Sequence, residues 1–183
     1  MGTGEDRYRR FLEGDEKAFD DVVIMYRPGL IRFVDSYVHD IYTSEDIAID
    51  CFAYLLVHPK RYNFKTPLKS YLYVLGRSRA LDHLRKIKRR GEISHEEAES
   101  ELTDFEEISD KVINTEQKKA LRRALDTLPE EMRQAVSLFY FDELSYNDIA
   151  LILKKKPKQI DNLLYRAREK LRTALSVEGG GVI

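Results

Sequence analysis

The stretch 144–171, LSYNDIALILKKKPKQIDNLLYRAREKL, breaks its apolar rhythm once, at three lysines followed by Pro157. Ser145 and Asp148 have the spacing of an N-terminal capping pair, so we expect a short helix before the lysines. Proline suits the first position of a helix, and apolar residues recur after it with helical spacing. These residues are Ile160, Leu163, Leu164, Ala167 and Leu171. The pattern predicts two helices joined by a basic turn.

The second of these helices carries polar side chains opposite its apolar stripe. They are Lys158, Asp161, Asn162, Tyr165, Arg166 and Glu169. Such side chains can donate and accept hydrogen bonds at base edges or phosphates. In a helix-turn-helix, the second helix enters the major groove of DNA with its N-terminal residues nearest the bases. The stretch therefore indicates DNA binding, although an amphipathic helix pair with a solvated lysine run has the same pattern.

Charges are segregated along the chain, although the net charge is only −1. Pro59–Gly91 holds eleven basic residues and one acid, and Lys154–Arg172 holds eight basic residues and two acids. Between them, Glu92–Glu116 holds ten acids and one lysine. Blocks of like charge are typical of segments that bind polyanions or that remain solvated. We therefore expect two cationic modules joined by an acidic linker.

The composition excludes several classes of protein. A chain of 183 residues that is 43% hydrophobic can bury the core of one domain or of two small ones. Its single cysteine, Cys51, cannot form an internal disulfide, and no Cys/His cluster suggests zinc. A metal hydrolase is disfavoured because the histidines lack ligand spacing such as HExxH. They are His39, His58, His83 and His95.

No apolar stretch approaches the roughly 20 residues needed to cross a bilayer, and MGTGEDRYRR at the N-terminus lacks the apolar core of a signal peptide. We expect a cytoplasmic protein with no membrane insertion and with no metal or other cofactor.

Scarce glycine and few alternating apolar runs predict a nearly all-helical chain. We expect one helix over Glu16–Met25 and a second that Pro28 opens. Thr43 and Asp46 have capping-box spacing, so a third helix should start near Ser44. A loop, RYNFKTP, then leads to a long helix from Leu68 to near Arg90.

The apolar residues of the long helix change sides, with Leu68 and Leu72 on one face and Leu81 and Leu84 roughly opposite. Its second half should therefore turn a different side to the core or to a ligand. Further helices are expected from Val112 to Leu125 and after Pro129, where Ala135, Val136 and Leu138 should be core.

Two stretches resemble a known family. LPEEMRQAVSLFYFDELSYNDIALILKKKPKQIDNLLYRAREKLR (128–172) resembles region four of bacterial sigma factors, the promoter-binding domain of these RNA polymerase subunits. SEDIAIDCFAYLLVHPKRYNFKTPLKSYLYVLGRSRALDHLRKIKRR (44–90) resembles region two of the extracytoplasmic-function class, also called group IV. With the N-terminal helices, the resemblance covers nearly all of the chain.

The resemblance implies two small helical domains, in an all-α fold. Region two would span 1–91, an acidic linker 92–110, and region four, with its helix-turn-helix, 111–176. A flexible tail would follow at 177–183. The linker would either thread toward the RNA exit path of the polymerase or act as a solvated tether.

In the family, the third helix of region two binds the clamp helices of the largest polymerase subunit. The resemblance places core-polymerase binding on Asp46, Ile49, Asp50 and Ala53. These positions fall opposite the apolar stripe of their helix, although an ordinary solvated face would look the same.

The long helix resembles the family's reader of the minus-ten element, whose non-template strand is separated from its partner. Separated strands are held by cations and by aromatic rings on which bases stack. The candidate residues are Phe64, Lys65, Lys69, Tyr73, Arg77, Ser78, Arg79, Arg85 and Lys86. Tyr71 is a further candidate, but it stands where the family commonly has Trp, so we expect it to be the most buried of these aromatics.

Region four would read the minus-thirty-five element as duplex DNA. The candidate residues are Lys155, Lys156, Lys158, Gln159, Asp161, Asn162, Tyr165 and Arg166. Asp161 stands where a cation is common in the family, and it can accept a hydrogen bond from a cytosine amino group. The promoter sequence therefore cannot be carried over from the family.

Four positions depart from the usual pattern. Ser78 stands where Asn is common, Gly76 where Ala is common and Phe139 where a basic residue often lies. Lys154 replaces a turn glycine, and in a left-handed turn it would cost about 1 kcal/mol. We therefore expect the turn to differ here.

Together these features predict a sigma factor that is not an enzyme. Its partners would be core RNA polymerase and promoter DNA, both as duplex and as the melted non-template strand. An anti-sigma partner is left open by the sequence. Two alternatives remain, namely a free-standing helix-turn-helix regulator, which leaves the first 90 residues unexplained, and a sigma-like interaction protein, which the departures at Ser78 and Phe139 would allow.

Overall fold

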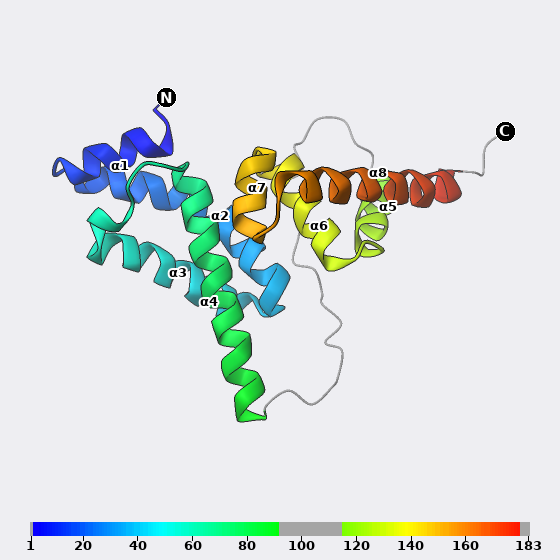
Figure 1. The fold of residues 1–183 in the computed structure, drawn as a ribbon, viewed down its shortest axis with the longest axis horizontal. Helices are drawn as coiled ribbons and strands as arrows, with labels where there is room; N and C mark the ends of the chain where they lie inside the picture. Colours follow the sequence, from blue (N-terminus) through cyan, green and yellow to red (C-terminus); the bar gives the residue numbers. More distant parts are fainter. Residues whose placement is uncertain (1, 92–114, 180–183) are drawn as a thin grey trace. The chain divides into compact units, whose positions relative to one another are not determined.

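The structure, a computed structural model, describes residues 2–91 and 115–179, with the side chains of 119–176 described in the second range. Every regular element in these ranges is helical, which confirms the all-α prediction. The predicted acidic linker, 92–110, lies outside the described residues. Two compact units are present, one containing helices α1–α4 and the other α5, α6, α8 and most of α7 (Figure 1). Within the described ranges, no helix is long and apolar enough to cross a membrane.

The first unit is organised around its second helix. It contains α1 (Gly4–Leu12), α2 (Glu16–Val38), α3 (Ile41–Val57), the short 3-10 helix η1 (Pro59–Arg61) and α4 (Leu68–Arg90). Helix α2 packs against α1, α3 and α4. Its buried residues lie on one side of the helix. They are Ala18, Phe19, Val22, Leu30, Phe33 and Val34.

Helix α2 continues through Pro28, so the prediction of two separate helices is wrong. Proline removes one intrahelical hydrogen bond and disturbs the carbonyl four residues earlier, which belongs to Ile24. Both residues lie on the outer side of α2, where Ile24 is 73% exposed and water can reach this carbonyl. The inner side of α2 is buried both before and after the proline, so packing maintains the helix across it.

Helix α3 also begins earlier than its sequence predicts. Asp40 is the N-cap, and its carboxylate accepts a hydrogen bond from the Thr43 backbone N–H at 3.1 Å. His39, the only residue between α2 and this cap, adopts a left-handed conformation with φ of 55°. Asp46 therefore lies inside the helix and has no capping role. Ser44, predicted as the start, is fully buried and donates to the Asp40 carbonyl oxygen at 2.8 Å.

Helix α4 has the predicted bounds and crosses α2 at very close range. A Cβ atom at Gly76 would lie 2.8 Å from Leu30 Cδ1 and 3.2 Å from Val34 Cγ2. Phe33 of α2 stacks on Tyr73 of α4, with ring centres 5.0 Å apart and an interplanar angle of 25°. The glycine that departs from the family pattern therefore lies at the contact between these two helices, where a Cβ atom would displace the Leu30 side chain.

The second unit contains α5 (Thr115–Asp126), α6 (Glu130–Val136), the π-helical turn η2 (Ser137–Phe141), α7 (Tyr146–Leu153) and α8 (Pro157–Gly179). Helix α8 packs against α5 and α6. The predicted core residues Ala135, Val136 and Leu138 are buried, as are Ile160 and Leu164 of α8. Of the helix predicted from Val112, the structure describes the part that begins at Thr115.

The close contact at Gly76 predicts that Gly76→Ala destabilises the protein. Alanine is favoured over glycine in a helix by about 1 kcal/mol, but forcing a methyl group into a packed core costs about 1–3 kcal/mol. Leu30 is fully buried and has little room to move, so we expect a net loss of about 1 kcal/mol in the free energy of unfolding, measured by urea titration.

Ser78→Ala is the matched control, because it places alanine at an exposed position two residues further along the same helix. It should change the free energy of unfolding by less than about 0.5 kcal/mol. A Gly76→Ala protein as stable as the wild type would contradict the packing argument.

Candidate functional site

The outer face of α3 carries the four residues predicted to bind core polymerase. Asp46, Ile49, Asp50 and Ala53 are all exposed, and Ile49 is 52% exposed. The opposite face of α3 is buried in the first unit. The sequence therefore placed these residues on the surface correctly, and their role in binding stays a prediction.

The same face is longer and more apolar than the sequence analysis indicated. Tyr42, Leu56 and Val57 are 77%, 51% and 69% exposed, and they continue the stripe at helical spacing. The signal was present in the run of three apolar residues 55–57, because one helix face cannot bury them all. We call this stripe, from Tyr42 to Val57, the α3 face.

The loop between α3 and α4, residues 58–67, presents Phe64 and Lys65. Phe64 has φ of 61°, in the left-handed region, and its ring packs 4.7 Å from the ring of Tyr62. Lys65 is exposed, and its backbone N–H donates to Asn63 Oδ1 at 3.1 Å. A non-glycine residue held in this conformation indicates that the surrounding contacts determine the shape of the loop.

The two arginines near the middle of α4 lie over aromatic rings of neighbouring helices. The Arg77 guanidinium is 6.0 Å from the ring centre of Tyr37 on α2. The Arg79 guanidinium is 5.3 Å from the ring centre of Tyr54 on α3, and its Nη2 donates to the Asp50 carbonyl oxygen at 3.5 Å. Both predicted DNA-binding cations therefore also brace α4 against the rest of the unit.

The remaining polar candidates of α4 are Lys69, which is half-buried, and three exposed residues further along the helix. Lys69 lies with its Nζ 5.9 Å from the ring centre of Tyr73. Ser78, Arg85 and Lys86 are exposed, and Arg85 forms an ion pair of 2.7 Å with Asp82. The C-terminal half of α4 projects beyond α2 and α3 (Figure 1).

The prediction that Tyr73 is a stacking platform is wrong for this conformation, because its side chain is fully buried. Tyr71, expected to be the most buried aromatic, is instead partly exposed. The two residues lie on different sides of α4, and the close contact with α2 turns Tyr73 inward against Phe33. Phe64 and Tyr71 are therefore the partly exposed rings among the minus-ten candidates.

In the second unit, the predicted helix-turn-helix is present. The Asp148 backbone N–H donates to Ser145 Oγ at 3.2 Å, as the capping pair predicts, and Pro157 is the first residue of α8. Seven of the eight predicted minus-thirty-five residues are exposed. They are Lys156, Lys158, Gln159, Asp161, Asn162, Tyr165 and Arg166.

Two of the eight residues have structural contacts within the unit. Lys155 is half-buried and forms an ion pair of 2.9 Å with Glu131 of α6. Gln159 Oε1 accepts a hydrogen bond of 2.8 Å from the Lys156 backbone N–H and so caps the start of α8. Both contacts fix the turn before the exposed face of α8.

The turn itself does not differ from the family pattern, contrary to expectation. Lys154 has φ of 54°, in the left-handed region where a glycine is usual. The Lys155 backbone N–H then donates to the Ala150 carbonyl oxygen at 2.9 Å, which closes the end of α7. Because this closure needs the left-handed residue, the lysine adopts it despite the cost.

Comparison with known proteins finds two family models that match the chain. The model described as "Sigma-70 region 2" matches residues 22–90, and the model described as "Sigma-70, region 4" matches residues 118–171. The first match covers most of α2 through α4, and the second covers most of the second unit.

Curated relatives are similar along most of their length. The RNA polymerase sigma-H factor of Pseudomonas aeruginosa is 28% identical over 176 residues, which cover 91% of this chain and 90% of that protein. The ECF RNA polymerase sigma factor SigW of Bacillus subtilis is 27% identical over 177 residues, covering 92% of this chain and 95% of that protein.

Two solved structures share the fold. One is the sigma factor RpoE in complex with the anti-sigma factor NepR from Bartonella quintana, with 22% identity, a TM-score of 0.65 and coverage of 88% of this chain and 98% of that one. The other is CnrH in complex with the cytosolic domain of CnrY, with 17% identity, a TM-score of 0.60 and coverage of 93% and 96%.

The strained turn predicts that Lys154→Gly stabilises the second unit. Glycine adopts the left-handed conformation without the steric cost that a Cβ atom imposes, so the free energy of unfolding should rise by about 0.5–1 kcal/mol. Urea titration followed by circular dichroism measures this change.

Lys154→Ala removes the same charge but retains the Cβ atom, and it should give no such gain. Equal stability of the glycine and alanine variants would show that Lys154 is not strained.

Proposed function

The chain belongs to the sigma-70 family and is a sigma factor of promoter-specific transcription initiation, and from this premise we propose which of its surfaces perform each step. The α3 face binds core RNA polymerase, α4 and the 58–67 loop hold the melted minus-ten strand, and α8 reads the minus-thirty-five duplex. The observation that carries the proposal is that the α3 and α8 residues predicted to bind are almost all exposed, on one helix of each unit, and that the two units follow the order of regions two and four in the family. The domain boundaries are those given above, with region two over 1–91 and region four over 111–176.

The α3 face suits a partner that offers both apolar and cationic groups. Its carboxylates, Asp46 and Asp50, stand on either side of Ile49, and apolar side chains extend the face in both directions. Such a mixture is typical of a protein interface, with an apolar centre and charges that select the partner. The clamp helices of the largest polymerase subunit are the partner that the family implies.

The minus-ten strand is held by charge and by stacking. Lys65, Lys86 and other exposed cations attract the phosphates, and an unstacked base stacks on the exposed part of the Phe64 ring. Stacking of this kind contributes about 1–3 kcal/mol per base and does not require duplex DNA. Strand separation thus exposes the bases that the loop can bind.

The minus-thirty-five duplex is read by the first turns of α8. Asn162 can pair with an adenine edge, and Asp161 can accept from a cytosine amino group. Lys156, Lys158 and Arg166 supply phosphate contacts from the same exposed face. Lys155 contributes less than its charge suggests, because Glu131 already engages it.

The protein is not an enzyme, since sigma factors perform no bond chemistry. Catalysis and its magnesium belong to the polymerase. We further propose that the protein acts in the cytoplasm, where the polymerase is, and that an anti-sigma factor regulates it. The second of these rests on the solved structure of RpoE with NepR, which shares this fold.

Asp50→Lys should abolish association with core polymerase. Reversing a charge within a protein interface costs several kcal/mol, so the dissociation constant should rise by on the order of 100-fold or more. Fluorescence anisotropy with purified core polymerase measures this. Asp20→Lys makes the same charge change at an exposed site on α2, outside the α3 face, and should leave the affinity for core unchanged.

Asn162→Ala should have the opposite profile, with normal core binding and weaker promoter use. Loss of a base contact costs about 1–3 kcal/mol. Transcription should therefore fall roughly 10-fold to 100-fold when promoter binding limits its rate. Thr173→Ala, at an exposed position in the C-terminal half of α8, is the control. If Asp50→Lys spared core binding and Asn162→Ala abolished it, the assignment of surfaces would be rejected.

The alternative of a free-standing regulator is tested by the same proteins. It predicts sequence-specific retention of DNA without core polymerase, and no effect of Asp50→Lys on that retention. A sigma-like interaction protein would give core association with no promoter-dependent transcript.

A further inference from the structure

Helix α1 has no role in the function proposed above. It ends at Leu12, before residue 22, where the match to region 2 begins. It is nevertheless built firmly into the first unit. Thr3 and Asp6 form a capping box, in which each side chain accepts the backbone N–H of the other residue, at 3.2 and 2.9 Å. Helix α1 is therefore a defined element and not a frayed terminus.

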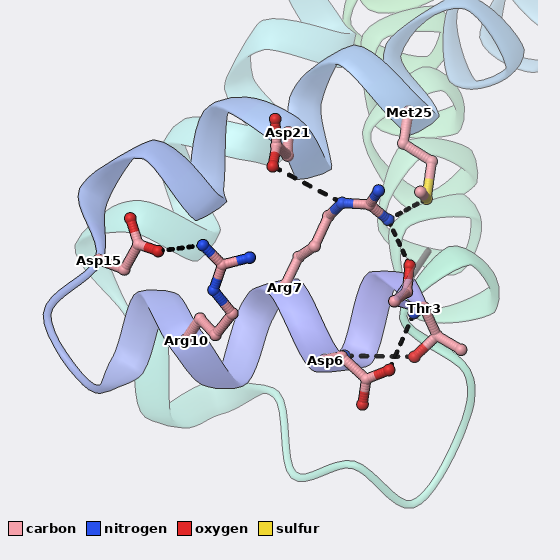
Figure 2. Close-up of polar contacts among 8 residues, drawn as sticks. Thr3, Asp6, Arg7, Arg10, Asp15, Asp21 and Met25 are labelled. Atoms are coloured by element: carbon pink, nitrogen blue, oxygen red, sulfur yellow. Dashed lines mark hydrogen bonds and ion pairs between the residues drawn. The ribbon is translucent and has the colours of Figure 1, made fainter.

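Polar contacts attach α1 to α2, as Figure 2 shows. Arg7 donates to the Gly2 carbonyl oxygen at 2.6 Å and lies 3.7 Å from the Asp21 carboxylate of α2. At the other end of α1, Arg10 forms an ion pair of 2.5 Å with Asp15, the residue before α2. These contacts fix α1 in one position along α2.

From this position, Glu5 caps the first turn of α4. The Leu68 backbone N–H donates to Glu5 Oε1 at 2.6 Å, across 63 positions of sequence. The residue before α4 is Pro67, which offers no side-chain acceptor, so the first N–H of the helix has no local cap. A carboxylate is also favourable at the positive end of the helix dipole.

Tyr8, one turn further along α1, holds the other end of the same loop. Its hydroxyl donates to the Pro59 carbonyl oxygen at 3.0 Å and lies 3.4 Å from the Leu55 carbonyl oxygen near the end of α3. The Tyr8 side chain is fully buried, and its ring packs edge-on against Tyr62 at 5.5 Å. A single helix thus contacts Pro59 near the start of the 58–67 loop and Leu68 directly after its end.

The middle of the loop is also in contact with α1, because the Arg9 guanidinium lies 4.7 Å from the ring centre of Phe64. We propose that α1 is the positioning element of the minus-ten-reading loop, with Glu5 and Tyr8 as its positioning residues. This proposal rests on the proposed function, in which Phe64 and Lys65 contact the melted strand. Neither positioning residue touches the DNA.

The physical reason for such an element is the entropy of the loop. Ten residues with a left-handed Phe64 would sample many conformations if only their two ends were fixed by α3 and α4. A ring that must be ordered before a base can stack on it binds that base more weakly. Contacts from α1 order the ring before DNA arrives.

The test uses holoenzyme assembled from core polymerase and the full chain. The probe is a pool of fork-junction DNA whose single-stranded non-template segment is randomised, and bound molecules are sequenced. We expect Glu5→Ala to lower the enrichment of the preferred segment about tenfold, as expected from the loss of one hydrogen bond. Affinity for core polymerase should be unchanged.

Three variants separate positioning from charge and from folding. Glu5→Gln removes the charge but retains the acceptor oxygen, so it should restore enrichment. Glu13→Ala removes an acid from the exposed end of the same helix and should behave as wild type. Tyr8→Phe removes only the hydroxyl that contacts Pro59, and it should lower enrichment as Glu5→Ala does. This second variant tests the proposal even if Glu5→Ala does not fold.

The outcomes distinguish a failure of this proposal from a failure of the proposed function on which it rests. If wild-type holoenzyme selects a sequence and both Glu5→Ala and Tyr8→Phe select it equally well, the role of α1 is overturned while the proposed function stands. If Glu5→Gln, which keeps an acceptor oxygen for the Leu68 N–H, selects no better than Glu5→Ala, the hydrogen bond to α4 is not what matters, and the positioning role is again rejected. If wild-type holoenzyme selects no sequence, both proposals fall.

Discussion

The close approach of α4 to α2 at Gly76 is the constraint on which the first unit depends. With no Cβ atom between them, Leu30 and Val34 pack directly against the backbone of α4, and Phe33 stacks on Tyr73. This contact sets the rotation of α4 about its own axis. Because of that rotation, Arg77 and Arg79 lie over aromatic rings of the flanking helices, while Ser78 between them faces water. The surface that α4 offers to DNA is therefore determined by an apolar contact on its other side.

The basic residues of this protein have two kinds of role. Lys155 and the two arginines of α4 are engaged within their own units, by a carboxylate or by aromatic rings. Long cationic side chains can do this because their stems cover apolar surface while the charged group stays partly hydrated. Others, such as Lys156 and Lys158, are exposed. A count of charges along the chain therefore overestimates the number of cations that are available for phosphate.

Elements whose determinants are local could be predicted closely. The helix over Leu68–Arg90, the Ser145 cap and Pro157 at the start of α8 follow from periodicity and capping chemistry within a few residues. Helix α1 was missed, because it is short and mostly polar and because the residues that hold it lie on α2 and in the 58–67 loop. The break expected at Pro28 was wrong because local propensity was outweighed by a buried stripe shared with three other helices. Tyr71 was expected to be more buried than Tyr73, and the reverse is observed for the same reason. Two residues on different faces of one helix cannot be ranked for burial until the partners of that helix are known.

The sequence by itself determined the all-helical class, the segregation of charge, the helix-turn-helix and the exposure of most residues predicted on α3 and α8, because composition, periodicity and capping are read from the chain without its tertiary contacts. The tertiary structure alone decided that α4 is capped by a carboxylate from α1, that Tyr73 is interior, and that Lys154 accepts a left-handed conformation in its turn. These features depend on atoms brought together from distant positions or on the balance between local strain and the closure of a turn. Such balances are settled only when the packed partners are in place.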